Sequence, residues 1–423
     1  MTSPDRPPAP APPAPAPPWL ARRLFPVLAT AGLVTIGLAS TIWWGPELLG
    51  RTAWALPHDL WGTMVAARRL WQLNWGGLYT SPTGLVGFPG AAVILVPVVA
   101  VIDAAGLSLR IPGAHNAHPG AWLLAGPYEI AISAVALFAA DALAEHLGVA
   151  RGQRALLAAA SAVALWSVSV RWGHPEDAVA VGLLLLGILA LARSRLPRSA
   201  WLIGAAAAVQ PLVLLALPVL VMVIPPRRLP GLLARAAVPG ALLLGAAVAA
   251  NWSATLGAVS RQPNWPALDH PTPWIFLAPH LAHGAVASGP ARILAILVAC
   301  GCAVAAGRGW QRARETGPWR PEMLQQVLWW VAVTLALRSV FEPVMVAYYL
   351  WPVLAVALIT AATTWSSLIA TAVAAVTLTF ASQVPWRGPW IWWTPMIAGL
   401  GITLYLARVR PRRPSAAIVQ PDG

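Results

Sequence analysis

Residues 171–193 read RWGHPEDAVAVGLLLLGILALAR, a polar turn that leads into an apolar run closed by an arginine. A run of roughly 20 apolar residues is long enough to cross a bilayer as a helix. With a mean hydropathy of +0.67 and 10% charged residues, the chain is predicted to be an all-α polytopic integral membrane protein. Comparable runs lie near 25–46, 85–105, 120–145, 155–172, 177–193, 199–224, 231–252, 290–307, 323–341, 343–360, 364–382 and 390–407.

The distribution of charge indicates a protein that lies in a membrane rather than one that binds nucleic acid. The formal net charge is +14, but the chain contains no lysine and its arginines gather between the apolar runs. Such an excess of basic residues in connecting segments is typical of the positive-inside rule. We therefore expect membrane lipids and no nucleic acid as partners.

Three regions are expected along the chain. Residues 1–20 are rich in Pro and Ala and are predicted to form a disordered cytoplasmic tail. Residues 21–407 form the predicted transmembrane domain, with external loops at about 47–119 and 253–289. Residues 408–423 form a basic cytoplasmic tail. Cys300 and Cys302 are two residues apart in an apolar run, so on a helix they point in different directions and are read as small apolar filler.

The arginines also select a path through the membrane. If 85–105 crossed fully and 199–224 crossed once, Arg110 would be gained inside, but five arginines would lie outside: Arg151, Arg154, Arg193, Arg195 and Arg198. If 85–105 is instead re-entrant or lies on the surface, and 199–224 is a hairpin broken at Gln210-Pro211, the dense arginine clusters become cytoplasmic. The second scheme predicts about twelve transmembrane helices with both termini inside.

This scheme brings polar residues from distant parts of the chain to one external face. They are Asp59, the 173–177 turn, the 253–289 loop and Glu342. Asp59 begins an amphipathic stretch, so we expect it on an interfacial helix of the first external loop. The 171–177 turn has two readings: a polar helix junction with Asp177 as N-cap, or a site for a phosphate, a sugar or a metal.

In the order of its motifs the chain resembles the GT-C superfamily of polyprenyl-phosphate-sugar-dependent glycosyltransferases, particularly the branch of actinobacterial α-mannosyltransferases. The resemblance begins at Asp59-Leu60, passes through Gly77-Leu78-Tyr79 and Phe88-Pro89 to Gly173-His174 and Gln210-Pro211, and ends at Glu342-Pro343 and Tyr348-Tyr349. Phe88-Pro89-Gly90 stands where the family usually has aromatic-Pro-Pro, and Tyr348-Tyr349 stands where the branch tends to have paired histidines. The resemblance therefore leaves the sugar open.

The resemblance implies transfer of mannose or a pentose such as arabinose, from a polyprenyl-phosphate donor to a cell-envelope glycolipid or polysaccharide, with Asp59 as the catalytic base. One carboxylate suffices because phosphate is already a good leaving group. Glu342 either binds an acceptor hydroxyl or a cation, or forms an ion pair with Arg338 one helical turn earlier; we favour the pair. The expected substrate-binding residues are His58, Arg171, His174, Glu176, Asp177, Arg261, His280, Arg338, Glu342, Tyr348 and Tyr349.

Some questions stay open on sequence alone. No cofactor is firmly indicated, and a divalent cation is left open. The expected location is the plasma (inner) membrane, with the active site on the extracytoplasmic side. Two other classes fit a polytopic chain: a non-catalytic partner in envelope assembly, and a lipid or sugar transporter, although no internal repeat of the kind common in transporters is evident.

Overall fold

The computed structural model describes residues 18–43, 58–80, 85–109, 121–310, 319–384 and 388–408, which are mostly helical with almost no sheet. The helices are α1 (Trp19–Arg22), α2 (Leu24–Trp43), α4 (His58–Trp71), α5 (Pro89–Val93), α6 (Val96–Ala104), α7 (Trp122–Ser133), α8 (Val135–His146), α9 (Arg151–Trp166), α10 (Pro175–Ala192), α11 (Leu196–Val209), α12 (Leu217–Met222), α13 (Leu229–Ala250), α14 (Trp252–Arg261), α15 (Gly289–Trp310), α16 (Pro321–Phe341), α17 (Trp351–Ala361), α18 (Trp365–Ala381) and α19 (Trp393–Leu406). The two short strands are β1 (His270–Pro271) and β2 (Val344–Met345).

Six segments of the described chain are long and apolar enough to cross a membrane: Leu123–His146, Arg151–Arg171, Pro175–Ala192, Pro226–Ala250, Gly289–Arg308 and Pro321–Phe341. Shorter apolar segments run over Leu24–Ala39, Leu196–Val209, Pro211–Met222, Ala347–Ala361, Trp365–Ala381 and Trp393–Leu406. The prediction of an all-α chain with helices suited to a membrane is confirmed at this level. Twelve crossings stay a prediction.

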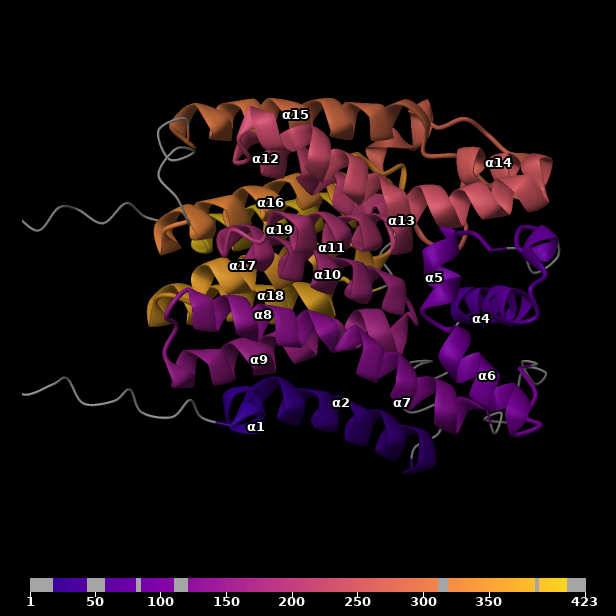
Figure 1. The fold of residues 1–423 in the computed structure, drawn as a ribbon, viewed down its shortest axis with the longest axis horizontal. Coiled ribbons are helices and arrows are strands. Elements are labelled where there is room, and N and C mark those ends of the chain that lie inside the picture. Colours follow the sequence, from indigo (N-terminus) through magenta and orange to yellow (C-terminus); the bar gives the residue numbers. More distant parts are fainter. Residues whose placement is uncertain are drawn as a thin grey trace, which may run out of the picture.

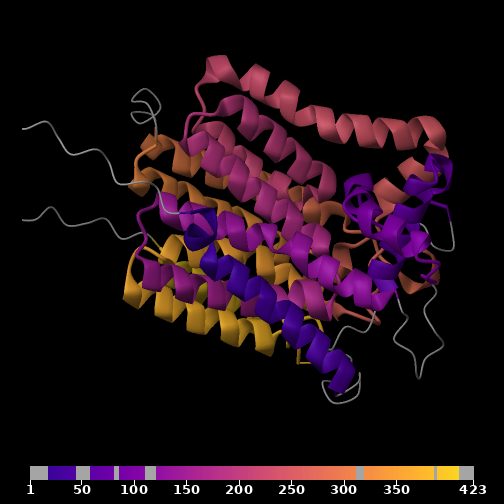
Figure 2. The same cartoon turned by 60° about the horizontal axis from the view of Figure 1, so that its bottom comes forward.

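The helices pack as a bundle around α10. In the 175–192 segment, 89% of the apolar window is buried, against 11% in the 226–250 segment. The two segments are about equally apolar, and such a helix can be covered by protein or by lipid, so apolar sequence alone does not place α10 at the centre. By contrast α13 lies along one edge of the bundle (Figure 2) and packs on α11.

The helices α4, α5 and α6 sit together at one end of the bundle, beside α14 and the C-terminal end of α13 (Figure 1). The stretch at 85–105 is broken into α5 and α6 between Val93 and Val96, so it forms no continuous helix of spanning length. This agrees with the expectation that the stretch does not cross as one helix. Here α4 lies against both short helices.

The expected break at Gln210-Pro211 is present. Helix α11 ends at Val209, Gln210 is extended, and a 3₁₀ segment begins at Pro211 and leads into α12. A proline cannot supply the helical N–H and clashes with the preceding turn, which explains the interruption. Gly90 of α5 packs on this point so closely that a Cβ there would lie 2.3 Å from the carbonyl oxygen of Ala208.

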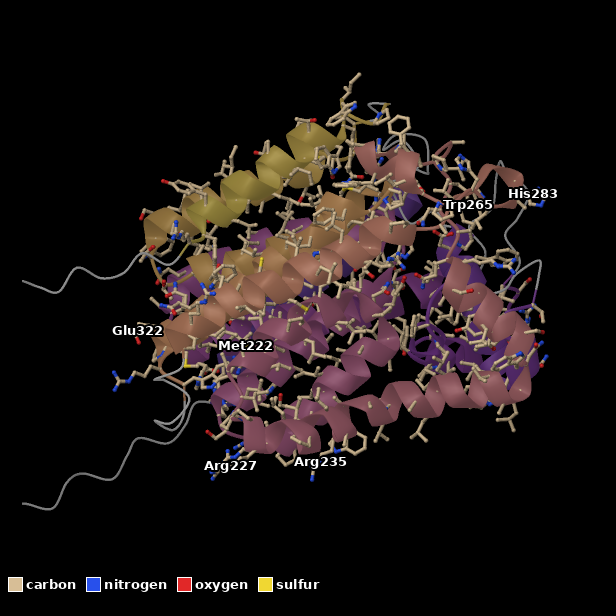
Figure 3. The ribbon with its side chains drawn as sticks, turned by 90° about the horizontal axis from the view of Figure 1, so that it is seen from above. Met222, Arg227, Arg235, Trp265, His283 and Glu322 are labelled. Carbon is tan, nitrogen blue, oxygen red and sulfur yellow. The ribbon has the colours of Figure 1, made fainter. Side chains whose placement is uncertain are left out.

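The segment between α14 and α15 folds over the same end of the bundle. Its strand β1 pairs antiparallel with β2, with His270 opposite Met345. The indole Nε1 of Trp274 donates to the carbonyl of Val340 across 2.6 Å, and the ring of His270 stacks on Trp392 with centroids 4.2 Å apart. The labelled Trp265 and His283 lie at this end, whereas Arg227 and Glu322 lie at the other (Figure 3).

The opposite end is held together by charged residues of α8, of α9 and of the junction between α1 and α2. Both Arg23 and Arg154 contact Oδ2 of Asp141 at 2.7 Å. The ring of Trp19 stacks on Phe138 with centroids 6.0 Å apart. Helix α1 therefore begins at Trp19, whose indole gains an aromatic partner, and residues 1–17 of the predicted tail lie outside the described residues.

Candidate functional site

Asp59 lies where helix α4 meets the start of α10. The apolar face of α4 is buried through Leu60, Met64 and Ala67, which leaves Asp59 in the first turn with its side chain 63% exposed. Its Oδ2 lies 3.5 Å from Nε2 of His174. An accessible carboxylate is thus held against an imidazole that comes from another part of the chain.

The 171–177 turn has an unusual backbone. The last turn of α9 widens into a π-helix over Ser167–Arg171, Gly173 has a φ of 62°, and Pro175 occupies the first turn of α10. A positive φ suits glycine because it lacks a Cβ, and π-turns occur frequently at functional sites. The N-cap of α10 is His174, so the reading of Asp177 as N-cap is wrong.

His174 lies between two carboxylates. Its Nε2 faces Asp59, and its Nδ1 lies 2.6 Å from Oε1 of Glu176. Burial of the ring disfavours the charged form, but the carboxylates of Glu176 and Asp59 outweigh burial and raise the pKa of His174 well above its ordinary value. The raised pKa favours the charged imidazole, which has one N–H for each carboxylate.

The tyrosine pair covers this group from the side. The ring of Tyr348 stacks on His174 with centroids 4.1 Å apart, and Tyr349 meets Tyr348 edge to face at 4.9 Å. The guanidinium carbon of Arg338 lies 3.6 Å from the centroid of the Tyr349 ring. Flat cations stack well on aromatic faces, so the pair gives both His174 and Arg338 a fixed orientation.

Asp177 follows His174 by three residues, in the first turn of α10, and its side chain is completely buried. Its Oδ1 accepts a hydrogen bond from Nε2 of Gln210 at 2.6 Å, and its Oδ2 accepts one from Nη1 of Arg338 at 3.2 Å. Each oxygen of this buried carboxylate is thus matched by a donor, as a buried charge requires. Arg338 is engaged by this carboxylate in the present structure.

The predicted ion pair between Arg338 and Glu342 is wrong. Helix α16 ends at Phe341. The carboxylate of Glu342 accepts a hydrogen bond from Ser288, just before α15, and one of 2.9 Å from Nη2 of Arg292 in the first turn of α15. The pairing rule for residues four apart fails because Glu342 lies beyond the helix. Glu342 holds the 264–289 segment to the bundle.

Other expected site residues have no such contact with the cluster. Arg171 is half-buried at the end of the π-helix, whereas Arg261 and His280 are exposed. Within the described ranges, no hydrogen bond or ion pair joins Arg171, Arg261 or His280 to Asp59 or His174. The side chain of His58 lies outside the described part of the chain.

Two acids near the cluster were missed by the sequence analysis. Glu129 of α7 is 1% exposed, and neither carboxylate oxygen has a hydrogen-bond partner among the described residues. The charged groups near it are Glu176 and His174. The second is Asp269, whose pKa is raised to about 6 by burial and then by the nearby charge of Asp59. An acid within the apolar 120–145 run was a usable signal for Glu129.

The arrangement suits proton transfer and anion binding at one end of the bundle. Asp59 can accept a proton from a group in solvent, and the adjacent imidazolium can stabilise a negative charge. Within the described ranges, no group of three or more His, Cys, Asp or Glu side chains is placed to hold a metal ion. No protein-family model matches the chain, and a search of curated proteins finds no match to it.

Proposed function

We propose that this chain is a membrane glycosyltransferase that moves a sugar, mannose or a pentose such as arabinose, from a polyprenyl-phosphate donor to a cell-envelope glycolipid or polysaccharide. The observation that carries the proposal is the 3.5 Å contact between the exposed Asp59 carboxylate and the buried His174. Asp59 stands at the start, and Tyr348 at the end, of the motif series on which the likeness to the GT-C superfamily rests. His174 contacts both residues, because the ring of Tyr348 stacks on the same imidazole.

In the proposed reaction Asp59 is the general base. The acceptor hydroxyl oxygen attacks the anomeric carbon and forms the new glycosidic bond, while its proton passes to Asp59. The bond between that carbon and the phosphate oxygen breaks, and the phosphate leaves with the electron pair. His174, as a cation, is placed to offset the negative charge at this edge of the site.

The topology we propose follows the same assignment. The six long and six shorter apolar segments described under the overall fold each cross the plasma (inner) membrane. The stretch at 85–105 is not one of these twelve. The arginines at the end of the bundle away from Asp59 favour a cytoplasmic place for that end and for both termini. The donor would then enter from the lipid, with its phosphate and sugar at the extracytoplasmic end beside α4.

The test is transfer of radiolabelled sugar from synthetic polyprenyl-phosphate mannose and arabinose to envelope glycolipid extracts, by purified wild-type protein and by Asp59→Asn. Loss of a general base typically costs about 10²–10⁴ in rate. Asp103→Asn is the matched control, because Asp103 pairs with Arg68 on neighbouring helices. Equal loss in both variants, or full transfer by Asp59→Asn, removes Asp59 from the mechanism.

Glu129 favours a transporter as the second candidate. A buried carboxylate without a hydrogen-bond partner in the described chain is typical of residues on an ion or substrate path. In proteoliposomes, a transporter would move the polyprenyl-phosphate sugar between leaflets without adding it to acceptor. Glu129→Gln would then abolish that movement. Sugar transfer by a Glu129→Gln protein would instead support the glycosyltransferase.

A further inference from the structure

A cavity of about 450 Å³ opens at the end of the bundle away from Asp59. Arginines from two distant parts of the chain form its polar side. Arg23 follows α1, and Arg193, Arg195 and Arg198 come from the turn between α10 and α11 and the first turn of α11. Figure 1 shows α1 at the end of the bundle opposite α4, α5 and α6.

The other wall of the cavity is apolar. It is built from Trp19 and Phe138, whose rings stack on one another, and from Leu186 and Leu189 of α10. Trp19 is 63% exposed, so this wall reaches the outer surface of the bundle. The cavity therefore offers positive charge and an apolar surface side by side.

The arginines of the cavity are not equally engaged. Arg23 is held by Asp141 at 2.7 Å and by Glu145 at 2.6 Å. Within the described residues, no ion pair joins Arg193, Arg195 or Arg198 to a carboxylate. Asp141 and Glu145 are already shared with further arginines, which are Arg22 and Arg154. This part of the chain thus carries positive charge that its own acids do not balance.

The environment of Arg193 shows the same imbalance. Burial and then the neighbouring charge of Arg195 lower the pKa of Arg193 from its ordinary value. The carboxylate of Glu145 acts in the opposite direction but is outweighed. An anion in the cavity would relieve this repulsion.

We propose that the cavity binds the headgroup of an anionic phospholipid, with the phosphate at Arg193, Arg195 and Arg198 and an acyl chain against Trp19, Phe138 and Leu186. Basic pockets between transmembrane helices bind such headgroups. Pockets of roughly 300–1,000 Å³ are typical of small-molecule sites, so the volume suits a headgroup. The positive-inside rule accounts for arginines at this end of the bundle, but it does not account for a cavity that places them beside an apolar wall.

The test measures binding of dioctanoyl-phosphatidylglycerol, dioctanoyl-phosphatidylcholine and inorganic phosphate to the full chain in nonionic detergent, by the shift of the thermal unfolding midpoint with ligand concentration. We expect phosphatidylglycerol alone to stabilise the wild-type protein. A triple variant with Arg193→Gln, Arg195→Gln and Arg198→Gln should bind this lipid at least about tenfold more weakly, since each surface arginine contributes measurably to anionic-lipid binding.

The matched control replaces Arg227, Arg228 and Arg320 by Gln. It removes the same charge. Arg227 and Glu322 both lie at the end of the bundle away from Trp265 (Figure 3), and Arg320 is two residues before Glu322 in sequence. Its affinity should stay within about twofold of wild type. Equal weakening in both variants would reduce the effect to net charge. Equal stabilisation by inorganic phosphate or phosphatidylcholine would contradict the site, and this comparison needs only the wild-type protein.

Discussion

Nη1 of Arg338 donates a hydrogen bond to Oδ2 of Asp177 across 3.2 Å and so joins the last turns of α16 to the first turn of α10. Asp177 is fully buried and the Arg338 side chain is 14% exposed. Two desolvated charges of this kind depend on each other, because removal of either one leaves the other unpaired away from water. The pair therefore fixes the floor of the candidate site.

Arg338→Met should lower the free energy of unfolding by about 3–5 kcal/mol, because it leaves the buried Asp177 with Gln210 alone. Arg68→Met is the control, since Arg68 is 42% exposed in its pair with Asp103 and exposed pairs contribute only about 0.2–1 kcal/mol. Denaturant titration in detergent micelles measures both. Similar losses for the two variants would contradict a special role for the buried pair.

The course of the helices could be predicted from the sequence because apolar runs and prolines act locally. The break at Gln210-Pro211 follows from the chemistry of proline alone. The same holds for the helix that begins beside Asp59, whose apolar positions recur with helical spacing. The approach of Asp59 to His174 agrees with the predicted gathering of polar residues at one face.

Partners within the site could not be predicted in this way. Arg338 was assigned to Glu342 because residues four apart are neighbours on a helix, yet a carboxylate 161 residues away in sequence holds it. Whether Asp177 caps a helix or pairs inside the bundle depends on where α10 begins, and helix ends are the least certain part of a sequence prediction. Asp269 was missed because only folding of the 264–289 segment brings it near Asp59.

Glu342→Ala should loosen the 264–289 segment without unfolding the bundle. The substitution removes the acceptor for Ser288 and for Arg292, and hydrogen bonds to charged groups contribute about 1.5–3 kcal/mol. Trypsin should then cleave after Arg261 about tenfold faster or more, because local opening exposes the chain. Mass spectrometry of timed digests measures the rate. The control is Glu322→Ala, at an exposed acid of α16, which should leave the cleavage rate unchanged. An unchanged cleavage rate in Glu342→Ala would contradict the role of Glu342.

Asp269 should make the protein less stable as the pH rises. Its pKa is about 6 in the folded chain, above the value of roughly 3.9 for an unfolded Asp. Between these two values the folded state binds more protons than the unfolded state, so stability falls as pH increases and is constant above about pH 6. Asp269→Asn removes this dependence and should be the more stable protein at pH 7, by roughly 3 kcal/mol.

Unfolding midpoints of wild type and Asp269→Asn from pH 4 to pH 8 measure the effect. The two curves should meet near pH 4 and separate towards pH 6. Glu322→Gln is the control for the general pH response, because this side chain is exposed. Parallel curves for wild type and Asp269→Asn would show that Asp269 has an ordinary pKa.

Gly204 permits a close approach between α11 and α13. A Cβ at this position would lie 2.2 Å from the carbonyl oxygen of Ala236, a distance that only a shift of the backbone can relieve. Gly204→Ala should therefore lower the free energy of unfolding by about 1–3 kcal/mol, the usual cost of overpacking. Gly245 of α13 is the matched position, because nothing lies within 4 Å of its Cβ. There, Gly245→Ala should stabilise the protein by about 0.5–1 kcal/mol, since alanine loses less conformational freedom in a helix. Unfolding in the same detergent measures both, and a stable Gly204→Ala protein would show that α13 does not lie this close to α11.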